Sequence, residues 1–227
     1  MADEQLFTIE EEEERERVLT FMESMYGMTP PSLRVLEKEA RRTGVPIIRP
    51  QTRQVLTMLL EITRPKNILE IGSATGFSAS VMRLAAPEAY ITGIELDEER
   101  FAKASALFAS DPKTQMIHGD ASDVLERLEG PYDLIFLDAA KGQYIRLLPR
   151  IRQLLSEDGI LAADNCLKDG EVTCSRFAVT RRNRTIHERM RAFLGALRDD
   201  EAFTVVLLQE GDGMCVCRKR RENPENT

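Results

Sequence analysis

The chain has 227 residues, of which 42% are hydrophobic and 30% are charged. This length and composition predict one soluble domain with a sizeable core, and they exclude neither enzymes nor binding proteins. The net charge of -7 argues against a protein that binds nucleic acid over its whole surface, although a local basic patch is compatible with it.

The sequence lacks the features of membrane and secreted proteins. It contains no run of about 18 uncharged apolar residues. Its N-terminus, MADEQLFTIEEEEERER, is acidic where a secretory signal would be basic and then apolar. No C-x-x-C spacing links the four cysteines, so neither a zinc site nor a disulfide framework is indicated. We therefore expect a cytoplasmic protein with reduced thiols and no membrane partner.

The first predicted helix follows an acidic start. Residues 10–17, EEEEERER, are a charged run that leads into VLTFMESMYG. Apolar residues then recur at helical spacing, as on a surface helix with one apolar stripe. They are Val18, Phe21, Met22 and Met25.

Two more helices are predicted before residue 65. One extends from Ser32, which we expect to be its N-cap, to a stop at Gly44. The next follows Pro50. Its predicted inner face consists of Val55, Leu56, Leu59 and Ile62. Residues 1–65 are therefore expected to form a helical cap.

From residue 67 onward, short apolar runs alternate with helical segments. The runs are NILEIG, AYITGIEL, TQMIHG, YDLIFLDA and GILAADN. This alternation predicts parallel strands in a sheet with helices on both faces. FTVVLLQ and MCVCRKR flank the turn Glu210-Gly211-Asp212-Gly213 and predict an antiparallel C-terminal hairpin. We expect an α/β fold in which residues 66–220 form a core around a seven-stranded, mostly parallel sheet, followed by a flexible tail at 221–227.

The turn after the first predicted strand is typical of a ligand site. In NILEIGSATGFSAS, the apolar run contains Glu70, and Gly72 and Gly76 follow four residues apart. Ligands of doubly wound sheets bind beyond the carboxyl ends of the strands, where glycines let them approach the backbone. The G-x-x-x-G spacing differs from the dinucleotide pattern G-x-G-x-x-G. Glu70 would repel a pyrophosphate but attract an ammonium group.

Two further acids end the next predicted strands. Glu95 stands where an acid typically binds ribose hydroxyls. Asp120, in HGDASD, could accept a hydrogen bond from an adenine amino group. An ammonium group and a ribose together favour S-adenosylmethionine over NAD. The alternative is that Glu70 and Glu95 only cap strands and that Asp120 caps a helix.

The segment from about Val45 to Arg218 resembles the cation-dependent O-methyltransferases, which include the catechol and caffeoyl-CoA O-methyltransferases. LEIGSATGFS is similar to the first motif of that family. The resemblance implies the Rossmann-like class I methyltransferase fold and S-adenosylmethionine as the cofactor. The positions that it assigns to the cofactor pocket are Ile48, Glu70, Gly72, Ser78, Glu95, Asp120, Ala121 and Asp138.

Oxygen donors follow the fourth and fifth predicted strands. Asp138 in LDAAKGQY, with Asp164 and Asn165 in ADN, is expected at one sheet edge. Such donors suit Mg²⁺ or Mn²⁺, although Asp and Asn are also common in turns. The resemblance implies that all three residues are metal ligands, in a site where a cation would favour the ionised acceptor hydroxyl. It also implies that Lys141 acts with Asp138 in catalysis, as a base or as an electrostatic partner of the oxyanion. A solvated lysine at a helix start is the alternative.

Two acceptor classes follow from the resemblance. DAAKGQY and the basic segment beyond it are more similar to the bacterial tRNA 5-hydroxyuridine methyltransferases than to the catechol enzymes. That branch forms 5-methoxyuridine at the wobble position of the anticodon loop, where the base is unpaired. The alternative is a small catechol or hydroxylated phenol. Residues 1–17 are not part of the family pattern and would repel RNA near the site. A cofactor-binding protein without turnover is disfavoured, because the metal ligands and Lys141 are present.

The segment after the metal residues is basic. Its RNA-binding candidates are Lys168, Arg181, Arg182 and Arg184, and Arg41, Arg42, Arg49 and Arg53 could extend the patch. The alternative is an exposed start of an amphipathic helix. Phe177 is available for base stacking, but we expect it to belong to the core. From the habit of the family and the amphipathic N-terminal helices we also expect a homodimer.

Overall fold

The computed structural model describes residues 2–167, 171–175, 177–209 and 211–221. Within these ranges, seven strands form one sheet in the order β3-β2-β1-β4-β5-β7-β6. The strands are β1 Asn67–Ile71, β2 Tyr90–Glu95, β3 Thr114–His118, β4 Tyr132–Leu137, β5 Leu155–Ala163, β6 Phe203–Leu208 and β7 Met214–Lys219. Strand β7 pairs antiparallel with β5 and β6, and the other pairs are parallel. The predicted sheet is therefore confirmed, while most of the predicted tail lies outside the described residues.

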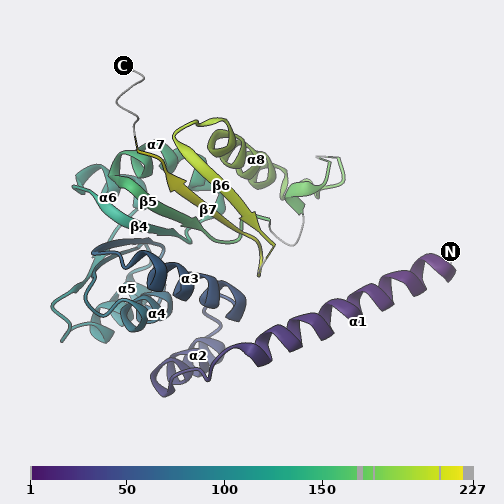
Figure 1. The fold of residues 1–227 in the computed structure, drawn as a ribbon, viewed down its shortest axis with the longest axis horizontal. Helices are drawn as coiled ribbons and strands as arrows, with labels where there is room; N and C mark the ends of the chain where they lie inside the picture. Colours follow the sequence, from purple (N-terminus) through teal and green to yellow (C-terminus); the bar gives the residue numbers. More distant parts are fainter. Residues whose placement is uncertain (1, 168–170, 176, 210, 222–227) are drawn as a thin grey trace.

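Helices cover both faces of this sheet, as predicted (Figure 1). The α-helices are α1 Ala2–Met25, α2 Pro31–Thr43, α3 Pro50–Thr63, α4 Phe77–Ala85, α5 Glu98–Leu107, α6 Ala121–Arg127, α7 Tyr144–Leu154 and α8 Arg184–Asp199. Short 3₁₀ helices are η1 Lys141–Gln143 and η2 Glu171–Thr173. Among them, none is long and apolar enough to cross a bilayer in the part of the chain that the structure describes.

Side-chain alternation along the strands divides the core into two clusters. In β1, Leu69 and Ile71 pack with α6, α7 and α8, whereas Ile68 packs with α3 and α4. In β4, Leu137 belongs to the first cluster and Phe136 to the second. Successive residues of a strand point to opposite faces, so a continuous apolar run is required when both faces are covered.

The N-terminal helices correct two details of the prediction. Ser32 lies inside α2, whose N-cap is Pro30; Pro31 takes the first helical position, where a missing N–H costs nothing. Gly44 ends the helix in the left-handed conformation, as predicted. In α3, Leu56 is buried and Val55 and Leu59 pack against the core, as predicted, but Ile62 is exposed and Leu60 is buried in its place. The buried stripe follows the i, i+4 spacing from Leu56 to Leu60, and a residue six positions after Leu56 lies about 120° away from it around the helix axis.

Helix α1 extends away from the rest of the molecule (Figure 1). Its predicted apolar residues Val18, Phe21 and Met25 are exposed, so they do not pack against the core of their own chain. Near the end of the helix, Glu23 accepts a hydrogen bond of 3.0 Å from Gln51 of α3.

Candidate active site

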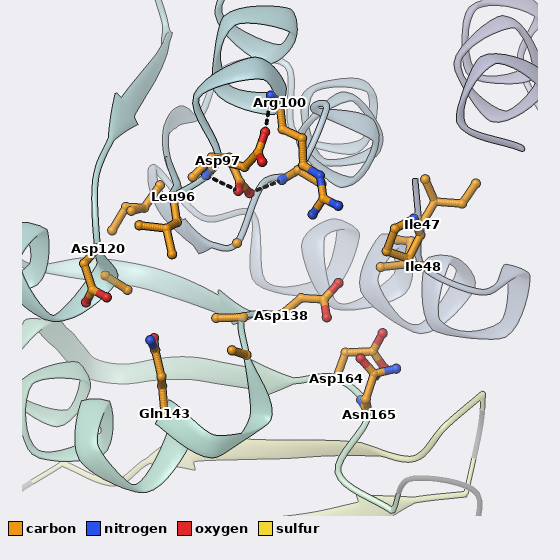
Figure 2. A pocket seen from close by; sticks show the side chains of 18 of the residues that line it. Ile47, Ile48, Leu96, Asp97, Arg100, Asp120, Asp138, Gln143, Asp164 and Asn165 are labelled. Atoms are coloured by element: carbon orange, nitrogen blue, oxygen red, sulfur yellow. Dashed lines mark hydrogen bonds between the residues drawn. The ribbon is translucent and has the colours of Figure 1, made fainter. Parts of the chain in front are cut away.

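A pocket of about 860 Å³ lies at the carboxyl ends of the parallel strands (Figure 2). The turns after β1 to β5 supply its base, and the segment before α3 and the β6–β7 turn supply further walls. Pockets of about 300 to 1,000 Å³ are usual for small-molecule ligands. The sequence-predicted residues that line it are Ile48, Arg49, Gly72, Glu95, Asp120, Ala121, Asp138, Asp164 and Asn165.

Gly72 is required by the sheet itself. Its φ is +97°, and a Cβ at this position would lie 2.2 Å from the carbonyl oxygen of Asp138. Access for a ligand was the predicted reason for this glycine, but the immediate constraint is the backbone that follows β4. The glycine nevertheless lines the pocket.

Glu70 lies behind the glycine turn and does not line the pocket within the described chain. Its side chain is fully buried, and neither carboxylate oxygen has a hydrogen-bond partner among the described residues. Burial raises the pKa of Glu70 to about 7; the nearby Ser78 and Ser73 hydroxyls oppose this rise, and the charge of Glu95 adds to it. Ser78, in α4, is also buried outside the lining. A cationic ligand group would offset the cost of this carboxylate.

Glu95 both caps a turn and faces the pocket. Its Oε2 accepts a hydrogen bond of 2.7 Å from the Ala74 N–H, and its Oε1 accepts one of 2.8 Å from the Asp97 N–H. Glu95 therefore caps the turn, as in the structural alternative, and it also lines the pocket.

Asp120 also caps an element and lines the pocket. It is the N-cap of α6 and accepts a hydrogen bond of 2.8 Å from the Ser122 N–H. Arg146 approaches the same carboxylate at 3.8 Å. The hydrogen bond from Ser122 lowers the pKa of Asp120 most, and the Arg146 charge adds to this effect. Asp120 and Gln143 lie at one end of the pocket, opposite Asp164 and Asn165 (Figure 2).

Asp138, Asp164 and Asn165 come together at that opposite end (Figure 2). The sheet hydrogen bonding continues into these turns, because the Asp138 N–H donates to Ile71 and the Asp164 N–H donates to Leu137. Asp164 is only 2% exposed. Burial raises the pKa of both acids, to about 7 for Asp138, where the charge of Asp164 contributes next. A buried and a half-buried carboxylate that repel each other, beside an amide oxygen, fit the donor set that a hard divalent cation prefers.

Lys141, in η1, lies beside these acids rather than in the pocket lining. Its positive charge lowers the pKa of both Asp138 and Asp164, although the burial of the two acids outweighs this effect. The lysine is thus within electrostatic reach of the acidic end of the pocket.

Several residues of the site were not predicted. Asp212 lines the pocket from the β6–β7 turn, and Thr52 donates a hydrogen bond of 3.3 Å to Asp164. The Tyr144 hydroxyl lies 3.1 Å from the carbonyl oxygens of both Leu137 and Asp164. An acid between two glycines in GDG was a usable signal for Asp212, because a strand antiparallel to β5 places that turn at the ligand edge. No comparable signal marked Thr52 or Tyr144.

Replacing Tyr144 by Phe is expected to lower the free energy of unfolding by about 1 to 2 kcal/mol, because two buried carbonyls that follow β4 and β5 lose their shared hydroxyl. Urea unfolding would measure this loss. Tyr90→Phe is the matched control, since Tyr90 is exposed and should change stability little. Equal stability of the two variants would contradict the bridging role.

The basic segment is only partly available for a ligand. Arg184 donates to the Val179 carbonyl at 3.3 Å, whereas Arg181 and Arg182 are exposed. Phe177 is 87% exposed, so the predicted core role is wrong. Val172 and Val179 fill the core position of this segment instead. Lys168 lies outside the described residues, and none of the described residues between 171 and 184 lines the pocket.

The strand order, with β7 antiparallel between β5 and β6 and a pocket over the parallel strand ends, defines the Rossmann-like methyltransferase fold. The sequence profile of the O-methyltransferase family matches residues 24–220, and the chain belongs to this family.

Its relatives include plant enzymes. The chain is 32% identical over 175 residues to tapetum-specific methyltransferase 1 of Arabidopsis thaliana, covering 72% of this chain and 74% of the relative. It is 30% identical over 183 residues to the caffeoyl-CoA O-methyltransferase of Stellaria longipes, covering 75% of each.

Solved structures agree with this assignment. The SAH-bound methyltransferase PaMTH1 of Podospora anserina matches with a TM-score of 0.81 at 27% identity, over 92% of this chain and 97% of that one. An O-methyltransferase of Bacillus cereus in complex with SAH has a TM-score of 0.79 at 19% identity, over 90% of this chain and 97% of that one, and shows the fold alone. The chain is therefore an S-adenosylmethionine-dependent O-methyltransferase.

Proposed function

We propose that this protein is a divalent-cation-dependent O-methyltransferase whose acceptor carries two adjacent oxygens, and that this acceptor is 5-hydroxyuridine at the wobble position of tRNA. The observation that carries the proposal is the convergence of Asp138, Asp164 and Asn165 at one end of the pocket (Figure 2). The product would be 5-methoxyuridine.

The proposed cofactor contacts follow the length of the pocket. Glu95 would bind the ribose hydroxyls and Asp120 the adenine amino group, since both acids face the pocket. Glu70 would supply negative charge toward the ammonium group from behind the turn, where its buried carboxylate otherwise has no partner among the described residues. The other proposed contacts are Ile48, Gly72, Ser78, Ala121 and Asp138.

The proposed reaction takes place between the methyl group and the acidic end. Asp138, Asp164 and Asn165 would hold Mg²⁺ or Mn²⁺, which when bound lowers the pKa of an acceptor hydroxyl. Lys141 would place positive charge near the acceptor oxygen. Burial of Asp164 would limit water on that side of the pocket and would strengthen these interactions.

The acceptor proposal draws support from the exposed residues of the basic segment. Phe177 offers an aromatic face for stacking, and Arg181 and Arg182 offer charge for phosphates. Arg184 already binds the Val179 carbonyl, so its proposed part is secondary. A small catechol is the second candidate, because the relatives include caffeoyl-CoA O-methyltransferases. Catechol and 5-hydroxyuridine both present neighbouring oxygens.

Methyl transfer from labelled S-adenosylmethionine tests the proposal directly. The acceptors are tRNA that contains 5-hydroxyuridine and a simple catechol, each with Mg²⁺ and with EDTA. We expect EDTA-sensitive label in the tRNA, recovered as 5-methoxyuridine. Label confined to the catechol would contradict the RNA acceptor, and label that resists EDTA would contradict the cation.

Replacing Arg181 and Arg182 together by Ala is expected to weaken tRNA binding and to reduce the slope of log affinity against log salt by about 2, because two phosphate contacts are lost. Filter binding over a salt series would measure both quantities. Arg198→Ala is the control, since Arg198 is exposed at the far end of α8 and is paired with Asp199. An unchanged slope in the double variant would remove these arginines from the RNA site.

A further inference from the structure

Asp212 is held between two partners at the edge of the pocket. Its Oδ2 accepts a hydrogen bond of 3.1 Å from Asn165 Nδ2, and its Oδ1 lies 2.5 Å from Arg49 Nη2. The side chain of Asp212 is 18% exposed, so this arrangement is largely shielded from water. One carboxylate therefore connects a proposed metal ligand to the segment that precedes α3.

The backbone of the turn is tied to the same region. The Cys166 N–H donates to Gly213 O at 2.7 Å, and the Leu167 N–H donates to Asp212 O at 2.9 Å. Gly211 packs so closely on α3 that a Cβ there would lie 2.8 Å from Thr52 Oγ1. Thr52 in turn donates to Asp164. These contacts fix the position of the Asp212 carboxylate relative to Asn165.

The chemistry of the pair sets the orientation of the Asn165 amide. An ionised carboxylate can only accept hydrogen bonds, so it selects the NH₂ group of a neighbouring amide. With Nδ2 turned to Asp212, the carbonyl oxygen Oδ1 is turned away from it. An amide can serve a cation only through that oxygen.

Asp212 itself does not complete a carboxylate cluster. Among the described residues, no group of three or more His, Cys, Asp or Glu side chains has an arrangement that could hold a metal ion. Both Asp212 oxygens are engaged, and the Arg49 guanidinium offsets the carboxylate charge. Its geometry is therefore that of a supporting residue.

We propose that Asp212 is a positioning residue for Asn165: it fixes the amide so that Oδ1 is presented for cation binding, and Arg49 holds Asp212 in place. This inference rests on the proposed cation dependence. It adds a residue outside the three proposed ligands, and it makes the β6–β7 turn part of the reaction site.

A charge-preserving exchange tests the proposal through Mn²⁺ affinity, measured by electron paramagnetic resonance on the SAH-bound protein. Asp212→Asn and Asn165→Asp are each expected to weaken Mn²⁺ binding about tenfold, because the donor–acceptor match is lost. In Asp212→Asn, two side-chain amides face each other, so the acceptor no longer selects the NH₂ group of Asn165. In Asn165→Asp, two carboxylates face each other and repel. The double variant restores one amide and one carboxylate with the original net charge, and its affinity is expected to return to within about threefold of wild type.

The outcomes separate this proposal from the proposed function. Wild-type protein that binds no Mn²⁺ would overturn the cation-dependent function and this inference with it. Two outcomes in which wild-type protein binds Mn²⁺ would overturn the positioning role alone. One is that the losses of Mn²⁺ affinity in the single variants add in the double variant. The other is an unchanged Mn²⁺ affinity in Asp212→Asn. Asp199→Asn, which removes an exposed acid from α8, is the charge-matched control. SAH affinity and circular dichroism check that each variant is folded.

Discussion

Asp164→Ala is expected to lower methyl transfer by about 100-fold or more while leaving cofactor affinity nearly unchanged. Asp164 supplies one of three converging oxygen donors and lies opposite the Asp120 end of the pocket, where the adenine is proposed to bind (Figure 2). Its loss would also leave Thr52 without the carboxylate to which it donates. A supporting residue of a metal site typically contributes 10- to 100-fold, so a ligand should contribute at least as much.

The experiment combines turnover at saturating Mg²⁺ with calorimetric titration of SAH. Asn165→Ala should behave in the same way, and Asp199→Asn should match wild type in both measurements. A variant at residue 164 or 165 with full, EDTA-sensitive turnover would show that the acidic end has been assigned wrongly. Loss of SAH binding together with activity would instead indicate a damaged pocket.

Glu70→Gln is expected to remove a pH dependence from the stability of the ligand-free protein. The folded-state pKa of Glu70 is raised from 4.5 to about 7, so between these pH values the folded state binds a proton that the unfolded chain has released. The contribution of Glu70 to the free energy of unfolding therefore falls as pH rises from about 4.5 to 7 and is constant above this window. Over the whole window the loss is on the order of 3 kcal/mol.

Urea unfolding at pH 5 and pH 8 measures this effect. Wild type should lose more stability between the two pH values than Glu70→Gln does, by up to that amount. The pH difference is the useful quantity, because a buried glutamine amide has a desolvation cost of its own. Glu126→Gln, at an exposed position of α6, is the control. If the free energy of unfolding changes equally with pH in wild type and Glu70→Gln, burial does not shift the pKa of this carboxyl.

The same substitution should weaken S-adenosylmethionine binding by about tenfold or more, since a hydrogen bond or ion pair to a charged group is worth about 1.5 to 3 kcal/mol. If Glu70→Gln is more stable than wild type at pH 8 but binds the cofactor more weakly, Glu70 is a residue retained for binding at a cost in stability. Unchanged affinity would remove Glu70 from the proposed ammonium site.

Regular patterns made much of this fold predictable. Apolar runs between helical segments predicted the strands, and the change to a hairpin around GDG predicted the antiparallel end of the sheet. The edge where Asp138, Asp164 and Asn165 meet followed from the rule that parallel strands share their carboxyl ends. Local chemistry and topology were sufficient in these cases.

The predictions were wrong or incomplete where tertiary packing decides which side chains are buried and which residues meet. The exposure of Ile62 depends on which side of α3 faces the sheet, and spacing alone fitted more than one choice. Phe177 was expected inside because it is aromatic, but valines of the same segment occupy the core. Asp212 was predicted as a turn residue only, because its contacts with Asn165 and Arg49 join segments distant in sequence.

The close approach of Gly72 to the Asp138 carbonyl brings the turn after β1, which is proposed to bind the cofactor, against the turn that carries a proposed metal ligand. No side chain fits between these backbones, so we expect a displacement of the turn after β1 to move the turn after β4. Thermodynamic reciprocity then applies: if an occupied cofactor turn changes cation affinity by some factor, a bound cation changes cofactor affinity by the same factor. The free energy of the fully assembled state would therefore be the same whichever ligand binds first.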